Sequence, residues 1–248
     1  MKYLLFLLIT VGVSYMTQSQ TRTEKTIAVR SGQIVEMNFK HPELISIKAW
    51  DQNEIKVVAI VSINNGGNDD AFEIEMESSD KVSVRSRVKN YEDLPRNIMI
   101  RHRGEDYFFN TSDPNAPEVQ KFKAENGDGY EYMQRGVIMD ITLEIMVPRG
   151  ISLDVDAKHG LVEVEGFTKN IEIDSKFGGI DVSVDAQVNN SMQVRTKFGE
   201  VYSNLDMTFS TRDSYDIGRW VTLEGKGRGS STSQYFKSEF GNVYLRKR

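Results

Sequence analysis

Acidic side chains alternate with apolar ones between Asp154 and Asp185, and pairs of carboxylates are the groups that cleave glycosidic bonds. β-Helical polysaccharide lyases and hydrolases place such acids with Arg or Lys on one exposed face. Alternation also puts polar side chains on the wet side of any half-buried strand. We therefore interpret the acids as solvent-facing and predict no catalytic residues, with a carbohydrate-active enzyme as the alternative. The acids are Asp154, Asp156, Glu163, Glu165, Glu172, Asp174, Asp181 and Asp185.

Three lysines in the same region each stand two residues before a glycine. In stacked strands their ammonium groups would repel one another unless solvent, nearby acids or a bound anion offset the repulsion. A solvated edge is the default interpretation, and an anion site is the alternative. His159 could be a ligand or a catalytic base, but we interpret it as a flat ring that substitutes for Phe. His41 and His102 show no partners in the sequence. The lysines are Lys158, Lys176 and Lys197.

Metal and cofactor motifs are poorly represented. Asn126, Asp128 and Gly129 partly match an EF-hand loop, but Ala124 occupies the first ligand position and Arg135 the twelfth, where a bidentate Glu is required. The sequence contains no nucleophile elbow, phosphate-binding loop, zinc-protease pair or dinucleotide fingerprint. We therefore predict no metal and no cofactor. The net charge of −5 argues against nucleic-acid binding, which needs a basic surface.

The lysines belong to a short pattern that recurs between alternating segments. Its glycines are 18, 21 and 42 residues apart. A fixed period near twenty residues, built from short strands, indicates a stacked β architecture. The copies are Lys158-His159-Gly160-Leu161-Val162, Lys176-Phe177-Gly178-Gly179-Ile180, Lys197-Phe198-Gly199-Glu200-Val201 and Glu239-Phe240-Gly241-Asn242-Val243.

This repeat predicts an all-β solenoid of stacked coils with the glycines at aligned corners; a β-sandwich is the alternative. We expect each glycine to adopt a positive φ, which costs glycine little. The residue before each glycine, His159, Phe177, Phe198 or Phe240, would then form an aromatic column. The structural corner residues are Gly160, Gly178, Gly199, Gly241, Phe177, Phe198 and Phe240.

The period also predicts a register. Strands one coil apart would place Asp174 beside Arg195, an opposite-charge pair. The spacing of 42 residues between the last two glycines is twice 21, so a degenerate coil is expected near Gly218.

The N-terminal residues and the composition of the chain indicate how it is divided into a signal peptide and two β regions. Lys2 followed by an apolar run from Leu4 to Val13 predicts a signal peptide over residues 1–19, because the run is too short to span a bilayer. No later stretch predicts a transmembrane segment. The chain contains no cysteine, which excludes disulfides and thiolate chemistry. We expect an N-terminal β region over 20–147 and a β-repeat region over 148–248, continuous with it.

One stretch, residues 102–136, interrupts the alternation. A loop of this length is usually functional or disordered, and its aromatic residues favour a partly ordered excursion with a hairpin. Aromatic and Arg side chains are enriched at the centres of interfaces, whereas the outer faces of the repeats are acidic or small. We therefore predict the recognition surface here, although the rings could instead pack the excursion. The candidate residues are Arg101, Arg103, Tyr107, Phe108, Phe109, Tyr130 and Tyr132.

The export signal, the segment from Ile45 to Val57 and the Lys-Phe-Gly-x-Val/Ile repeats together resemble the bacterial exported putative-adhesin family of β-strand-repeat proteins. The resemblance covers most of the chain outside the excursion. It implies a right-handed single-stranded β-solenoid at the cell envelope.

We accordingly predict a non-enzymatic exported cell-envelope protein, an adhesin or scaffold. The alternatives are a β-helix polysaccharide lyase or hydrolase and a sensory or assembly module of the envelope. Its partners would be cell-surface, glycan or envelope components, and its place the periplasm, the cell surface or the medium.

Overall fold

The computed structural model describes residues 20–127, 129–166, 169–184, 191–212, 220–227 and 233–248. The expected signal peptide, Asp128 and Asp185 lie outside these ranges, and so does Gly218. Within them, no helix is long and apolar enough to cross a membrane.

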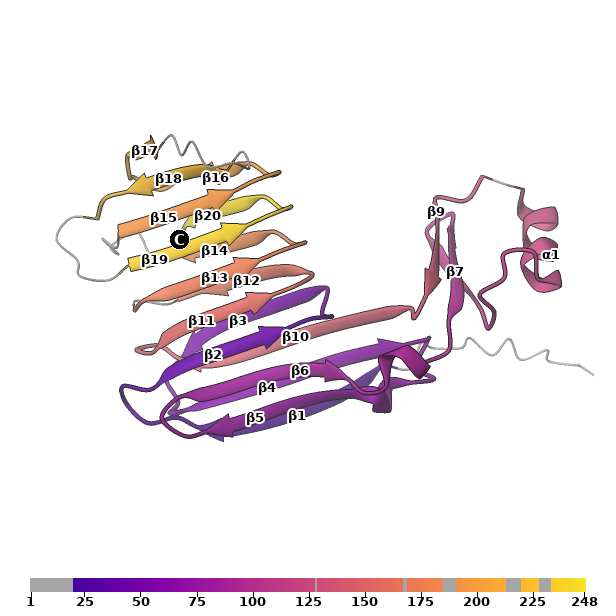
Figure 1. Cartoon of the computed structure of the whole chain (residues 1–248), viewed down its shortest axis with the longest axis horizontal. Helices are drawn as coiled ribbons and strands as arrows, with labels where there is room; N and C mark the ends of the chain where they lie inside the picture. Colours follow the sequence, from indigo (N-terminus) through magenta and orange to yellow (C-terminus); the bar gives the residue numbers. More distant parts are fainter. Residues whose placement is uncertain (1–19, 128, 167–168, 185–190, 213–219, 228–232) are drawn as a thin grey trace, which may run out of the picture.

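Two large β-sheets make up most of the described chain, so the expected all-β class is confirmed (Figure 1). In spatial order the first sheet contains β1 (Thr21–Ala28), β4 (Glu54–Ile63), β10 (Met139–Pro148), β3 (Leu44–Trp50), β12 (Leu161–Glu165), β14 (Ile180–Val184), β20 (Val243–Lys247) and β16 (Val201–Ser203). The second contains β17 (Phe209–Arg212), β18 (Val221–Gly225), β15 (Ser191–Thr196), β19 (Ser233–Ser238), β13 (Ile171–Ser175), β11 (Ser152–Ala157), β2 (Ile34–Phe39), β6 (Val82–Val88) and β5 (Phe72–Ser78).

The alternation of residues decides which side of each strand is buried. In β11, Leu153, Val155 and Ala157 are buried, whereas Asp154 and Asp156 are exposed. The buried residues of both sheets belong to one hydrophobic cluster, so the apolar sides of the sheets face each other. Each fully buried Val or Ile contributes about 1.5–3 kcal/mol.

Six neighbouring strands of each sheet run parallel, because β6 joins β2 and β10 joins β3, and five of the six in each sheet form repeating pairs in register. These five are β2, β11, β13, β19 and β15 in the second sheet and β3, β12, β14, β20 and β16 in the first. The chain crosses from the second sheet to the first between β2 and β3, and at the equivalent corner of each later pair. Successive strand pairs therefore lie on top of one another (Figure 1).

Four glycines lie in one column at this corner, in the spatial order Gly160, Gly178, Gly241, Gly199. A Cβ added to Gly178 would lie 1.7 Å from the carbonyl oxygen of Gly160, and one added to Gly199 would lie 2.0 Å from that of Gly241. The expected positive φ is present at Gly160, where φ is 84°, and is wrong for the other three. Those three positions need glycine because a neighbouring backbone occupies the space of a side chain.

The last strand pair of the chain is not the last in the stack. Strand β19 lies between β13 and β15, and β20 lies between β14 and β16. The predicted pairing of Asp174 with Arg195 is therefore wrong: Lys237 lies between them and its Nζ is 2.5 Å from Asp174 Oδ2. Gly199 and Gly241 are direct neighbours in the column, and the coil expected near Gly218 falls outside the described residues.

The N-terminal part departs from the parallel pattern. Strands β1 and β10 pair antiparallel with β4, and β5 pairs antiparallel with β6. Strand β10 then pairs parallel with β3, which joins this part to the stack. Both sheets thus contain strands from before and after residue 148.

The excursion is ordered and has its own core. Strand β7 (Asn97–His102) pairs with β8 (Glu105–Phe109) and β9 (Tyr132–Gly136), and Figure 1 shows this small sheet standing off one side of the large sheets. The helix α1 (Pro117–Asn126) was not predicted, because only Val119 and Phe122 of its ten residues are buried. They pack on Ile98 and Ile100 of β7.

Candidate binding surface

A column of rings runs along the corner beside the glycines. The ring centroids of His159 and Phe177 are 5.2 Å apart, those of Phe177 and Phe240 also 5.2 Å, and those of Phe240 and Phe198 4.9 Å. Interplanar angles of 16° to 20° show that the rings lie face to face. The three Phe side chains remain 46%, 47% and 60% exposed at Phe177, Phe240 and Phe198. Because their faces cover one another, the rings present their edges to solvent as an apolar strip.

The same column continues into the N-terminal part. Phe39 is the register partner of Ala157, so Lys40 and His41 occupy the corner positions equivalent to Lys158 and His159. The ring of His41 stacks on Tyr91 of the 3-10 helix η2 (Tyr91–Asp93), with centroids 5.2 Å apart. The residue after His41 is Pro42, and its carbonyl oxygen would lie 2.3 Å from a Cβ on Gly160.

A row of charged side chains accompanies the rings. The corner residues before the rings are, in spatial order, Lys40, Lys158, Lys176, Glu239 and Lys197. The insertion of β19 thus places an acid between two lysines, and Lys197 Nζ lies 3.2 Å from Glu239 Oε1. At this end of the row, the repulsion predicted from the sequence is offset by a carboxylate from the last strand pair.

The other end of the row opens into a hollow between the small sheet and the large ones. Its volume is about 590 Å³. The walls come from the β2–β3 corner, η2, the β11–β12 corner and the segment that joins β9 to β10. The lining includes Lys40, His41, Glu43, Tyr91, Glu92, Arg96, Gln134, Arg135, Gly136, Val137, Met139, Lys158 and His159.

The two imidazoles of this hollow sit in a positive field. Burial first, and then the charges of Lys40, His159 and Lys158, lower the pKa of His41 to about 4. Burial also lowers the pKa of His159, followed by the charges of Lys158 and Lys40. Both side chains are therefore neutral at pH 7. A neutral imidazole with a lowered pKa is a weak base, so neither ring adds positive charge to the hollow.

The residues predicted to carry recognition on the excursion fall into two groups. Tyr107 and Phe109 pack on Phe122 of α1, with centroid distances of 4.7 and 5.6 Å, and Tyr130 joins the same cluster. These rings are part of the core of the excursion. His102, for which the sequence shows no partner, is buried edge-on against Phe122.

Arg101 and Tyr132 lie on the opposite face of the small sheet, as does Phe108, the cross-strand partner of Met99. The guanidinium of Arg101 donates to both carboxylate oxygens of Asp106 and lies 5.2 Å from the ring centre of Tyr132. Arg103 is exposed in the turn between β7 and β8, with φ of 54°. The hydrogen bonds from Arg101 to Asp106 raise the pKa of the guanidinium, so its charge is fixed.

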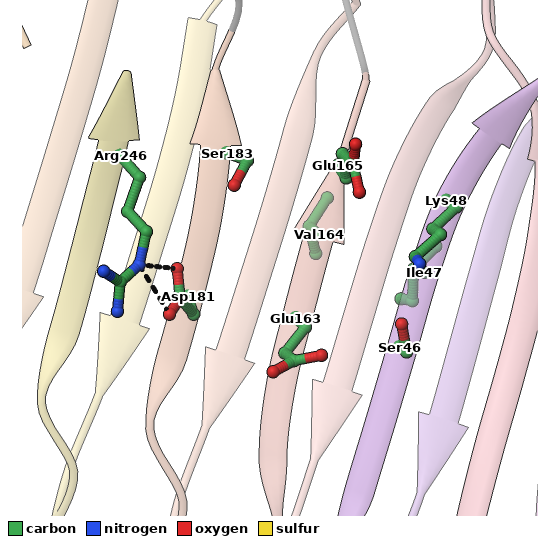
Figure 2. A pocket seen from close by; sticks show the side chains of 9 residues that line it. All are labelled: Ser46, Ile47, Lys48, Glu163, Val164, Glu165, Asp181, Ser183 and Arg246. Atoms are coloured by element: carbon green, nitrogen blue, oxygen red, sulfur yellow. Dashed lines mark hydrogen bonds and ion pairs between the residues drawn. The ribbon is translucent and has the colours of Figure 1, made fainter. Parts of the chain in front are cut away.

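Apart from Asp185, which is outside the described residues, the acids from which the enzyme alternative arose lie on strands of the two large sheets. Figure 2 shows Glu163, Glu165 and Asp181 side by side on β12 and β14, with Arg246 of β20 reaching across to Asp181. Arg246 Nε lies 2.8 Å from either oxygen of Asp181, and Arg248 Nη1 lies 2.6 Å from Glu165 Oε1. In the described residues, no group of three or more His, Asp and Glu side chains is arranged to hold a metal.

Lys40, His41 and Tyr91 were not predicted from the sequence as site residues, although the sequence contains a signal for the first two. The dipeptide Lys40-His41 repeats as Lys158-His159, and each is followed by a residue that turns the chain. Tyr91 carries no such signal, because only the fold brings η2 against the corner. Of the repeat residues singled out in the sequence, Lys158 and His159 line the hollow, and none of the five candidate rings of the excursion does.

Comparisons with known proteins give a likeness of fold alone. No protein-family model and no curated protein matches the chain. A crystal structure of a putative cell adhesion protein from Clostridium sporogenes matches 93% of this chain and 100% of its own, with a TM-score of 0.50 at 9% identity. A putative adhesin from Bacteroides fragilis matches 93% of this chain and 99% of its own, with a TM-score of 0.26 at 9% identity.

Proposed function

We propose that this chain is a non-enzymatic exported protein of the cell envelope that acts as an adhesin or scaffold, and that the ring column is its recognition surface. The observation that carries the proposal is the exposure of Phe177, Phe240 and Phe198 in one continuous strip. An aligned row of large exposed apolar side chains marks an interaction site more often than a solvated surface.

The architecture supports this role. We interpret the parallel, in-register strand pairs and the glycine column as a right-handed single-stranded β-solenoid, as the family resemblance implies. A rigid stack repeats one side chain at each level, so a linear polymer can contact several levels at once. The name of the Clostridium sporogenes protein, whose fold is similar, favours adhesion over the scaffold role.

The acidic faces support a binding role over an enzyme. Asp181 and Glu165 are engaged by Arg246 and Arg248 on an open surface. A glycosidase needs two carboxylates at a set separation across a substrate, one of them with a raised pKa. Asp154 has a raised pKa, caused first by desolvation and then by Glu36 and Asp156, but it lies on the other sheet from Glu163 and Asp181.

The test compares two exposed rings on different surfaces. Phe177 in the column and Tyr202 on β16 are both 46% exposed. We expect Phe177→Ser to reduce adhesion of the purified protein to intact cells and to immobilised cell-surface glycans. Tyr202→Ser serves as the matched control and should leave adhesion unchanged.

Equal adhesion by wild type, F177S and F240S would remove the column as the recognition surface. Loss of adhesion in Y202S alone would move the surface to the β16–β20 face, where Tyr202 and Tyr244 stack with centroids 5.1 Å apart. Thermal unfolding of each variant checks that the fold is kept.

A further inference from the structure

In the row of corner residues, the lysine at one end forms an ion pair, whereas the two lysines at the other end do not. Lys197 is paired with Glu239, which the last strand pair supplies. Lys40 and Lys158 are adjacent in the row, and no acid of the described residues lies within ion-pair distance of either. Neighbouring strands are about 4.8 Å apart, so two unpaired ammonium groups in equivalent positions repel each other. An anion between them would remove this repulsion.

The hollow beside these lysines is also lined by an arginine of the small sheet. Arg135, at the end of β9, lines the same hollow, and its Nη2 donates to the carbonyl oxygen of Ser112 at 2.9 Å. Arg135 is the cross-strand partner of Ile98, which packs on α1, so this contact holds the guanidinium on the α1 face of the small sheet. The cations whose charges act together on His41 and His159 in this hollow are therefore Lys40 and Lys158.

The acids of the hollow offset only part of its positive charge. Glu92 lies 3.2 Å from Arg96, so these two neutralise each other. Glu43 adds one carboxyl group to the hollow; desolvation first and the nearby Asp140 second raise its pKa, and the charge of Arg101 lowers it. The neutral rings of His41 and Tyr91 complete the wall and stack on each other. The space has the size of a small-molecule site, about 300–1,000 Å³.

We propose that this hollow binds the anionic group of an acidic sugar, with Lys40 and Lys158 as the cationic contacts and the rings of His41 and Tyr91 as the wall against which the sugar lies. Lysine and arginine bind carboxylate and sulfate groups through charge-assisted hydrogen bonds. Aromatic walls suit a sugar ring, which has apolar faces and polar edges. When one such sugar of a polysaccharide is bound in the hollow, the rest of the polymer could extend along the ring column, which begins at His159.

The three histidines allow a direct test by imidazole NMR on the full chain. His41 and His159 line the hollow, and His102 is buried in the core of the excursion as an internal reference. We expect polygalacturonate to shift the signals of His41 and His159 and to raise their pKa, while His102 does not move. Dextran sulfate tests a sulfate source for the same anion chemistry, and neutral dextran is the control.

Variants then assign the contacts. Lys40→Gln or Lys158→Gln should weaken binding of the acidic polymer about tenfold, as expected for the loss of one charge-assisted contact. Lys121→Gln changes an exposed lysine of α1 and should leave affinity within about twofold, the range of a remote surface charge. Both hollow lysines are exposed, so the substitutions leave the core intact.

The outcomes are decisive in both directions. Binding of either acidic polymer that needs Lys40 and Lys158 supports the site, and the polymer that binds identifies the anion. No shift of His41 with either polymer, equal binding of neutral dextran, or unchanged binding in K40Q and K158Q would overturn it. Phe177→Ser separates this site from the proposed adhesion surface. Lost cell adhesion with retained polymer binding supports two separate sites, and retained cell adhesion with retained polymer binding supports the hollow alone. Lost cell adhesion, with no polymer binding that needs Lys40 and Lys158, supports the column alone.

Discussion

Glu239 lies 3.2 Å from Lys197, although 42 residues separate them along the chain, because the last strand pair enters the stack beside the strand that carries Lys197. Both side chains are about three-quarters buried, with 25% and 26% of their surface exposed. The contact therefore ties the C-terminal segment to its neighbour at a corner where lysines would otherwise adjoin.

We expect Glu239→Gln to lower the free energy of unfolding by about 1 kcal/mol, the upper end for a partly exposed ion pair. Guanidinium would screen the charges, so the measurement is urea unfolding at low salt and again at 1 M NaCl, where the difference should shrink. Glu77→Gln, an exposed acid of β5, is the control. A loss that does not change with salt would mean that packing and not charge is responsible.

The glycine column predicts a large effect from one methyl group. Because a Cβ at Gly178 would lie 1.7 Å from the carbonyl oxygen of Gly160, Gly178→Ala should lower the free energy of unfolding by about 3 kcal/mol or more. Gly150→Ala adds the same methyl group where nothing lies within 4 Å and should be nearly neutral. Denaturant midpoints of the two variants give the comparison, and similar midpoints would contradict the close approach.

Acid should destabilise the protein through His41. Its folded pKa of about 4 lies below the ordinary 6.5, so the unfolded chain takes up a proton that the folded chain refuses. This contribution to stability is complete above pH 6.5 and is lost as the pH falls toward 4. For a half-exposed ring we expect about 1–2 kcal/mol, a discounted value of the full shift.

The comparison of wild type with His41→Gln isolates this histidine from the carboxylates that titrate in the same range. Unfolding free energies at pH 7 and pH 4.5 should differ less in the variant. Lys40→Gln should reduce the acid sensitivity only in part, because burial is the first cause of the shift and Lys158 and His159 also contribute. An identical pH profile in H41Q would show that carboxylates alone account for it.

The repeat could be predicted from the sequence because its physical requirements are local. A glycine at each close approach, a ring before it and alternating Val and Ile fix the corner and the buried faces within each copy. The order of the copies could not be predicted, since Phe177 would stack as well on Phe198 as on Phe240. Threading of β19 between β13 and β15 is decided by longer-range pairing.

The hollow could not be predicted from the sequence either, because its residues come from distant parts of the chain. Lys40 and Lys158 are 118 residues apart, and Arg135 arrives from a separate small sheet. The excursion supplied aromatic residues of the type found at interfaces, yet Tyr107 and Phe109 are used to cover α1. Composition alone does not distinguish a ring that binds a partner from one that packs a short helix.

The inserted strand pair leads to a prediction about local stability. Chain ends usually fray, and the end coil of a repeat stack has only one neighbour. Here β19 and β20 have a neighbour on each side, and Phe236, Val243 and Leu245 are buried. We therefore expect the backbone amides of Phe236 and Leu245 to exchange with deuterium as slowly as that of Ile173 in the middle of the stack.

Strand β17 provides the contrast within the same molecule. It precedes β19 in the chain but lies at the edge of the second sheet, paired only with β18 among the described strands. Its amides, such as that of Ser210, should exchange faster than those of the C-terminal strands by orders of magnitude, because opening an edge strand breaks one ladder and opening β19 breaks two. Hydrogen exchange followed by mass spectrometry on the full chain measures both segments in one experiment. If residues 233–248 exchange before β17 does, the C-terminal pair is a loose end and the insertion contributes little to the stability of the stack.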